Sequence, residues 1–181
     1  MKAVQGGKTP AVFLDRDGTL MRDVDYCGDP NDVHLFDDVS EALRRLKNHG
    51  YKLVVITNQS GIGRGYFNKE QYQNVERELA RQIGDGLIDA TYYCPHLPSD
   101  GCRCRKPAAT MVVRAAVDHD LDLGQSFFVG DKRSDIECGW NAGVKTVLVQ
   151  TGYGKNTDSD VADFVAKNLI EAAEFILKQT K

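Results

Sequence analysis

The chain has 181 residues, of which 41% are hydrophobic and 27% are charged. These values predict one folded domain spanning residues 1–181, and they exclude a wholly disordered chain. Its 23 Lys and Arg residues nearly balance 26 Asp and Glu residues, giving a formal net charge of -3. A nucleic-acid-binding protein usually carries a basic surplus, so nucleic acid is not an expected partner. No apolar run approaches the ~18 residues of a membrane span, and the first ten residues show no signal peptide. We therefore expect a cytoplasmic protein.

Short β-rich runs alternate with longer helical patterns along the chain. The expected strands are residues 11–14, 53–56, 88–93, 126–129 and 146–149, and the expected helices are residues 39–48, 69–83, 108–119, 135–141 and 161–178. Asn68 is a suitable cap for the second helix, and Gly84 a suitable end. The alternation predicts an α/β fold, a single Rossmann-like parallel sheet with helices on both faces.

Polar residues follow three of the expected strands. Asp15 follows the first strand, Thr57 the second and Asp131 the fourth. In an open α/β sheet, ligands bind outside the carboxyl ends of the strands. Three separate segments therefore point to one site.

Asp15 and Asp17 form the sharpest local pattern, because two carboxylates two residues apart leave an apolar strand at a turn. Like charges this close repel unless a cation or a shared proton compensates them. Mg²⁺ takes oxygen ligands from one or two carboxylates and a phosphate, and the segment around Asp131 supplies further carboxylates. The alternative is a turn with helix-capping carboxylates. That interpretation is weaker because Thr57, Lys106 and Asp131 are also present.

The five cysteines are unevenly spaced. An odd count without a secretory signal argues against a disulfide framework. Residues 94–104 gather three thiols and one imidazole, those of Cys94, His96, Cys102 and Cys104. A Cys₃His set satisfies tetrahedral Zn²⁺. Reduced free thiols, or a disulfide between two of the three cysteines, are the alternatives.

These motifs together resemble the haloacid dehalogenase (HAD) superfamily. The resemblance rests on DRDGT at residues 15–19, Thr57, Lys106 in an RKP segment and GDKRSD at residues 130–135. The cysteine loop and NQSGIGRG at residues 58–65 narrow it to the heptose-bisphosphate phosphatase and histidinol-phosphate phosphatase families. NQSGIGRG, with VQTG at residues 149–152, favours the heptose family.

The resemblance implies a Mg²⁺-dependent phosphatase that works through an aspartyl-phosphate. Asp15 would be the nucleophile and Asp17 the general acid and base, while Thr57 and Lys106 would bind the transferring phosphoryl group. The implied Mg²⁺ ligands are the Asp15 and Asp131 carboxylates and the backbone carbonyl of Asp17. The chain leaves no room for the large cap domain of many superfamily members. The cysteine loop would hold a structural Zn²⁺.

The substrate that the resemblance implies is D-glycero-D-manno-heptose 1,7-bisphosphate, which would lose its 7-phosphate. The product, heptose 1-phosphate, would serve the synthesis of nucleotide-activated heptose and lipopolysaccharide or other glycans. We expect a monomer. The implied substrate contacts are Asp23, Val24, Asp25, Tyr26, Asn58, Gln59, Ser60, Arg64, Arg105 and Lys132. The alternatives are a histidinol-phosphate phosphatase and a non-enzymatic phosphoacceptor signalling domain.

Overall fold

The computed structural model describes residues 7–179. The strands are β1 (Thr9–Leu14), β2 (Lys52–Asn58), β3 (Ala90–Cys94), β4 (Leu121–Gly130), β5 (Lys145–Val149) and β6 (Phe164–Ala166). The α-helices are α1 (Val39–Asn48), α2 (Ser60–Gly63), α3 (Lys69–Ile83), α4 (Thr110–Asp118), α5 (Arg133–Ala142) and α6 (Leu169–Gln179). Most of the segment that bears on the signal-peptide expectation, residues 1–6, lies outside the described residues.

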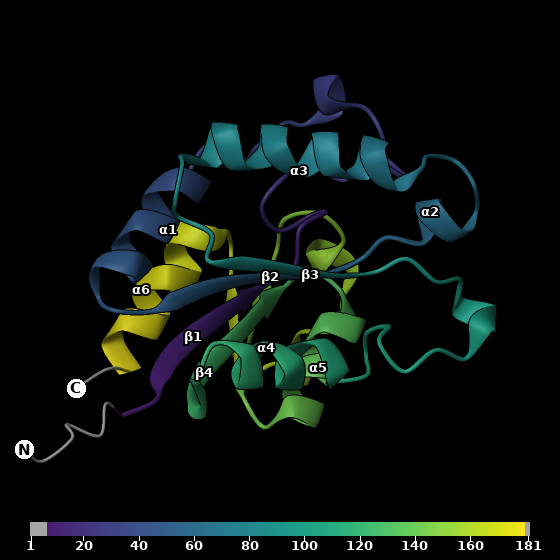
Figure 1. The fold of residues 1–181 in the computed structure, drawn as a ribbon. Helices are drawn as coiled ribbons and strands as arrows, with labels where there is room; N and C mark the ends of the chain where they lie inside the picture. Colours follow the sequence, from purple (N-terminus) through teal and green to yellow (C-terminus); the bar gives the residue numbers. More distant parts are fainter. Residues whose placement is uncertain (1–6, 180–181) are drawn as a thin grey trace, which may run out of the picture.

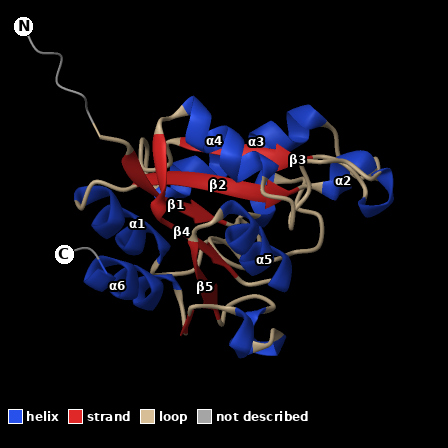
Figure 2. Ribbon diagram, turned by 90° about the horizontal axis from the view of Figure 1, so that it is seen from below, coloured by secondary structure: helices blue, strands red, loops and turns tan. Residues whose placement is uncertain are grey.

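The six strands form one sheet in the order β3-β2-β1-β4-β5-β6, and every neighbouring pair is parallel. Helices cover both faces: α1, α3 and α6 lie on one side, and α4 and α5 on the other (Figures 1 and 2). The predicted α/β sheet with helices on both faces is confirmed, and no cap domain interrupts it.

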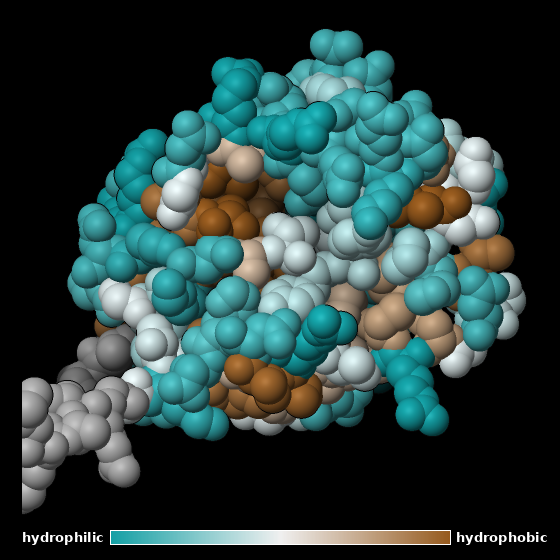
Figure 3. All heavy atoms as spheres, viewed as in Figure 1, coloured by the Kyte–Doolittle hydropathy of each residue, from teal (hydrophilic) through white to brown (hydrophobic). Residues whose placement is uncertain are grey.

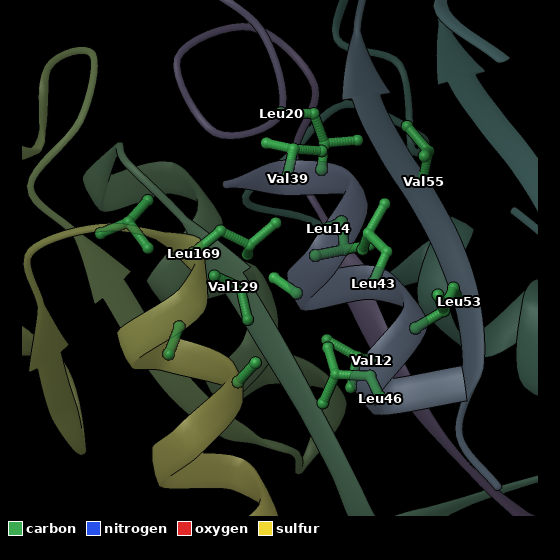
Figure 4. Close-up of a cluster of buried hydrophobic side chains, with 14 of the residues drawn as sticks. Val12, Leu14, Leu20, Val39, Leu43, Leu46, Leu53, Val55, Val129 and Leu169 are labelled. Atoms are coloured by element: carbon green, nitrogen blue, oxygen red, sulfur yellow. The ribbon is translucent and has the colours of Figure 1, made fainter. Parts of the chain in front are cut away.

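The alternation of side chains along β1 divides the core between these two layers. Val12 and Leu14 belong to the larger cluster, under α1, α3 and α6, whereas Ala11 and Phe13 belong to the cluster under α4. The larger cluster is drawn in Figure 4, where Leu43 of α1 lies close to Leu14. Fully burying such a leucine stabilises the fold by about 1.5–3 kcal/mol. Because β1 is buried on both faces and paired on both edges, the residue that follows it is held firmly.

Helix α3 begins as its sequence predicts. The Asn68 side chain accepts a hydrogen bond from the backbone N–H of Gln71, and the Gln71 side chain accepts one from the backbone N–H of Asn68. This reciprocal capping box satisfies two amides that would otherwise lack partners. Gly84 ends the helix in a positive-φ conformation, as expected.

The prediction of one helix over residues 161–178 is wrong in its first half, because Phe164–Ala166 forms a sixth strand on β5. The Asp163 carboxylate accepts hydrogen bonds from the backbone N–H and hydroxyl of Thr146, at 2.7 and 2.8 Å. That bond pair attaches the segment to β5 before a helix can start. Asn168 then accepts from the backbone N–H of Glu171 at 3.1 Å, and α6 begins there.

The visible face of the molecule is largely hydrophilic, with small hydrophobic patches between (Figure 3). On α4, Val113 and Val117 are exposed. Among residues 7–179, no helix has both the length and the apolar composition that crossing a bilayer requires.

Candidate active site

Three buried carboxylates meet at the carboxyl edge of the sheet. Asp15 follows β1, Asp131 follows β4, and Asp135 lies in the first turn of α5. One oxygen of each lies within 4.8 Å of the others. Like charges this close in a medium of low polarity need a compensating cation or proton. The arrangement therefore demands positive charge.

The pKa values of Asp15 and Asp131 are raised because the carboxylates are buried and lack enough positive charge around them. Burial, followed by repulsion from Asp135, raises the pKa of Asp15 to about 6. Burial, then Asp15 and Asp135, raises the pKa of Asp131 to about 8. The Oδ1 atom of Asp131 is buried and has no hydrogen-bond partner within residues 7–179. A carboxylate oxygen left free beside another carboxylate fits a hard divalent cation such as Mg²⁺.

Lys106 supplies one positive charge from the protein itself. Its Nζ donates to Asp15 Oδ1 at 2.6 Å and to the Ile56 carbonyl at 2.7 Å, and it lies 2.7 Å from Asp135 Oδ1. Burial lowers the pKa of Lys106, but Asp135 and Asp15 outweigh burial and raise the pKa above its ordinary value. Lys106 is thus a fixed cation beside Asp15. The sequence analysis did not foresee its pairing with Asp135.

Asn58, at the end of β2, holds Lys106 by its backbone. The Asn58 Oδ1 accepts from the backbone N–H of Lys106 at 3.0 Å, and its Nδ2 donates to the Lys106 carbonyl at 3.3 Å. A side-chain amide that satisfies both groups of one peptide fixes that residue in position. In this structure Asn58, one of the expected substrate contacts, orients Lys106.

The Asp17 carboxylate lies at the mouth of the site, where three side-chain N–H groups hold it. Arg16 donates to it from Nε and Nη2, the latter at 2.9 Å, and Gln59 Nε2 donates at 2.8 Å. The same Gln59 nitrogen donates to Thr57 Oγ1 at 2.9 Å. Gln59 thereby connects Asp17, the expected general acid and base, to Thr57, whose hydroxyl is expected to bind the phosphoryl group.

Two glycines make room for Asp131. A Cβ on Gly18 would lie 2.2 Å from Asp131 Oδ2, and a Cβ on Gly152 would lie 2.3 Å from the same atom. The loop after β5 is held over this edge because Thr151 donates to the Gly18 carbonyl at 2.6 Å and Tyr153 N–H donates to Asp131 Oδ2 at 2.8 Å. A larger residue at either glycine would displace the carboxylate.

These groups open into a cavity of about 260 Å³. Its lining includes most of the predicted site residues, namely Asp15, Asp17, Asp23, Asp25, Tyr26, Thr57, Asn58, Gln59, Ser60, Arg105, Lys106 and Lys132. Val24, Arg64 and Asp131 do not line it; Asp131 lies beneath the lining, beside Asp15 and Asp135. The lining also includes Tyr153 and Ser134, which the sequence analysis missed. Asp131 directly follows β4, whereas Tyr153 lies four residues beyond the end of β5, so the rule about residues directly after strands does not find it.

Cations on the cavity wall are held by neighbours. Lys132 Nζ donates to Asp23 Oδ2 at 3.0 Å and lies 4.8 Å from the centroid of the Tyr153 ring. Arg64 lies outside the lining, with its guanidinium carbon 5.5 Å from the centroid of the Tyr26 ring. Contacts of this kind attract a cation to the face of the ring, so each of the two cations is held beside an aromatic residue of the cavity lining.

The predicted zinc loop brings its four candidate ligands together. Sγ of Cys104 lies 3.0 Å from Sγ of Cys94 and 3.6 Å from Sγ of Cys102, and Nδ1 of His96 lies 3.2 Å from Sγ of Cys104. These sulfur separations exceed the ~2.05 Å of a disulfide bond, and all five cysteines are free. The disulfide alternative is therefore wrong. Four converging soft ligands fit tetrahedral Zn²⁺.

The fold and the carboxylate cluster define an uncapped α/β protein of the haloacid dehalogenase type. A family model described as HAD-hydrolase-like matches residues 103–172. A D-glycero-beta-D-manno-heptose-1,7-bisphosphate 7-phosphatase of Haemophilus ducreyi is 40% identical over 92% of this chain and 97% of its own length. The Thermosynechococcus vestitus D-glycero-D-manno-heptose-1,7-bisphosphate 7-phosphatase is 38% identical over 92% of this chain and 95% of its own.

A solved structure agrees with these relatives. The D,D-heptose 1,7-bisphosphate phosphatase from B. bronchiseptica, in complex with magnesium and phosphate, has a TM-score of 0.87 and 32% identity, over 94% of this chain and 99% of that one. The chain belongs to the D-glycero-D-manno-heptose-1,7-bisphosphate 7-phosphatase family of the haloacid dehalogenase superfamily. The signalling-domain alternative is therefore wrong.

The packing of Gly152 on Asp131 makes a testable prediction about Mg²⁺ binding. We expect Gly152→Ala to weaken Mg²⁺ affinity by about tenfold or more, because the new methyl group displaces a carboxylate expected to be a ligand. Isothermal titration with Mg²⁺, and the rise in melting temperature that Mg²⁺ produces, measure the change.

Gly143→Ala is the matched control. Gly143 also has a positive φ, of 74° against 49° for Gly152, but a Cβ there meets nothing within 4 Å. Both variants carry the backbone strain of a left-handed alanine, about 1–2 kcal/mol, and only Gly152→Ala displaces Asp131. Equal Mg²⁺ affinity in the two variants would contradict the prediction.

Proposed function

We propose that this chain is a Mg²⁺-dependent phosphatase that removes the 7-phosphate of D-glycero-D-manno-heptose 1,7-bisphosphate. The observation that carries the proposal is the cluster of Asp15, Asp131 and Lys106 at the end of the central strand. That cluster lies in a chain that matches heptose-bisphosphate phosphatases over nearly its full length. The product, heptose 1-phosphate, supplies the synthesis of nucleotide-activated heptose and of lipopolysaccharide or related glycans.

In the first half of the reaction, an oxygen of the Asp15 carboxylate attacks the phosphorus atom. The bond between phosphorus and the C7 oxygen breaks, and Asp17 gives that oxygen a proton, so the sugar leaves as an alcohol. Lys106 and the Thr57 hydroxyl donate hydrogen bonds to the phosphoryl oxygens, whose charge they stabilise. The three N–H donors of the Lys106 ammonium are directed at Asp15, Ile56 and Asp135. The donor that bonds Asp15 would therefore pass to a phosphoryl oxygen as the Asp15 carboxylate attacks.

In the second half, a water molecule attacks the phosphorus atom of the aspartyl-phosphate. Asp17, now ionised, takes a proton from that water, and the bond between phosphorus and the Asp15 oxygen breaks to release inorganic phosphate. Mg²⁺, when bound, neutralises the charge that the carboxylates and the phosphoryl group bring together. The Asp15 and Asp131 carboxylates and the backbone carbonyl of Asp17 would hold it.

The cavity wall suits a phosphorylated sugar. A sugar bisphosphate carries about four negative charges at neutral pH, and the chain itself carries a net charge of -3. Local cations must therefore attract the substrate, and we assign this role to Arg105 and Lys132, with Arg64 beside Tyr26 at the rim. The Asp23 and Asp25 carboxylates accept hydrogen bonds from sugar hydroxyl groups. Asp25 and Tyr26 both have positive φ, a strained geometry often found at binding loops.

The four clustered ligands of the 94–104 loop would hold a structural Zn²⁺. The loop is connected to the site at two points: Gln59 N–H donates to the Cys94 carbonyl at 2.7 Å, and Cys104 is separated from Lys106 only by Arg105. All four positions around the ion would come from the protein, which leaves none for a catalytic water. Zinc would therefore stabilise the loop that carries Arg105 and Lys106.

We further propose that residues 1–181 act as one domain and as a monomer, because every group assigned to the reaction comes from one chain. Free thiols suit the reducing cytoplasm, where phosphorylated sugars are made and consumed.

Replacing one zinc ligand should impair folding and turnover together. We expect Cys102→Ser to lose bound zinc, to melt at a lower temperature and to release phosphate more slowly, because the loop before Lys106 loosens. Metal analysis, thermal melting and phosphate release measure the three effects. Cys138→Ser is the control. The Cys138 thiol lies outside the cluster, so this variant should keep its zinc. Normal melting and turnover in a zinc-free Cys102→Ser protein would overturn the structural role.

The substrate can be tested directly against the runner-up, a histidinol-phosphate phosphatase, which would share the nucleophile, acid/base and zinc loop. We expect kcat/KM to be at least about 100-fold higher for heptose 1,7-bisphosphate, because a site built to pair a second phosphate loses those pairings with a monophosphate. Asp15→Asn, which lacks the nucleophile, is the blank. A preference for histidinol phosphate would replace the proposed substrate and leave the mechanism intact.

A further inference from the structure

Arg16 lies between the two aspartates of the site, yet neither half of the proposed reaction uses it. It is completely buried and ranks among the largest buried side chains of the described residues. Its charge cannot be neutralised by deprotonation, because guanidinium groups stay protonated in proteins. A buried, permanent cation must have specific partners. The partners of Arg16 therefore indicate its role in the site.

The guanidinium is divided between two carboxylates that come from different elements. Its Nε and Nη2 atoms donate to Asp17, at 3.1 and 2.9 Å for the best pairs. Its Nη1 atom donates to Glu76 of α3 at 2.9 Å. The Nη2 atom also donates to Gln59 Oε1 at 3.1 Å. The planar group is thus held at three corners, and only one of its carboxylate partners belongs to the catalytic loop.

Glu76 is remote from the reaction in the chain, 60 residues from Arg16, and it does not line the cavity. Its side chain is 18% exposed, so it reaches the buried guanidinium from the edge of the core. The Tyr72 ring, one turn earlier on α3, lies 5.7 Å from the guanidinium carbon and covers one face of it. Helix α3 therefore contributes two contacts to Arg16, an ion pair from Glu76 and a ring contact from Tyr72.

We propose that Glu76 is a positioning residue, which fixes Arg16 so that its Nε and Nη2 edge orients the Asp17 carboxylate for proton transfer. This rests on the proposed function, in which Asp17 is the acid and base. A planar guanidinium anchored at one edge has a defined opposite edge. Without the anchor, Nη1 has no carboxylate partner, and the orientation of the guanidinium depends on Gln59 and Asp17 alone. The guanidinium and the Asp17 carboxylate can then shift together. Misplacing a reacting group by an ångström costs about 100-fold in rate.

The test compares leaving groups in three variants: Glu76→Ala, Glu76→Gln and Glu70→Ala. Glu70 is an exposed acid on the same helix, so its replacement removes an equal charge without touching Arg16. The substrates are heptose 1,7-bisphosphate, whose alkoxide needs a proton to leave, and p-nitrophenyl phosphate, whose phenolate does not. We would measure kcat and KM for both substrates in each variant. With the aryl phosphate, we would also look for a pre-steady-state burst of p-nitrophenol.

We expect Glu76→Ala to lower kcat for the sugar bisphosphate by about 10- to 100-fold with little change in KM. With the aryl phosphate, transfer to Asp15 should stay fast while hydrolysis of the aspartyl-phosphate slows, so a burst appears before a reduced steady state. Glu76→Gln, which keeps an acceptor for Nη1, should recover most of the activity, and Glu70→Ala should match wild type.

The proposal is overturned if Glu76→Ala keeps wild-type kcat on both substrates, or if burst and steady state fall equally with the melting temperature. Should Glu76→Ala not fold, Glu76→Asp takes its place, because its shorter side chain keeps the charge but draws the acceptor back from Nη1. Reduced sugar-phosphate turnover with an aryl-phosphate burst in Glu76→Asp then supports the proposal, and wild-type kcat on both substrates overturns it. A wild-type protein that ignores the sugar bisphosphate overturns the proposed substrate alone, because the aryl-phosphate burst still tests the positioning of Asp17.

Discussion

The crowding of Asp15, Asp131 and Asp135 at the end of the central strand is the constraint on which the rest of the site depends. Three buried carboxylates within 4.8 Å of one another destabilise the fold unless positive charge stays among them. Lys106 supplies part of that charge, and the Asn58 amide holds its backbone in place. The remaining charge is left for Mg²⁺ and makes the same edge attractive to it. The clustered carboxylates that lower the stability of the fold are therefore the same groups that phosphoryl transfer requires.

Much of this could be predicted from sequence, because two simple rules apply. Apolar runs such as residues 11–14 give strands, and polar residues directly after parallel strands meet at one edge. This rule places Asp15, Thr57 and Asp131 at one edge, and the spacing of Cys94, His96, Cys102 and Cys104 predicts that these four side chains converge, as they do.

The remainder depended on long-range contacts that no local pattern encodes. The strand at Phe164–Ala166 forms because Asp163 bonds to Thr146 on β5, and its periodicity resembles a helix start. Asn58 stays a predicted substrate contact and lines the cavity, but no local pattern predicts that its amide bonds the Lys106 backbone 48 residues away. The ion pair of Arg16 with Glu76 depends on how α3 packs, since 60 residues separate the two along the chain.

The central claim is that Asp15 carries the phosphoryl group during turnover, and rapid-quench mass spectrometry tests it most directly. The enzyme is mixed with Mg²⁺ and heptose 1,7-bisphosphate, quenched in acid within one turnover and digested. The account predicts a phosphoryl mass increment on the peptide that contains Asp15, which disappears as turnover completes and never forms in Asp15→Asn. Full turnover with no phosphorylated peptide at any quench time, or a phosphoryl group on another residue, would contradict it.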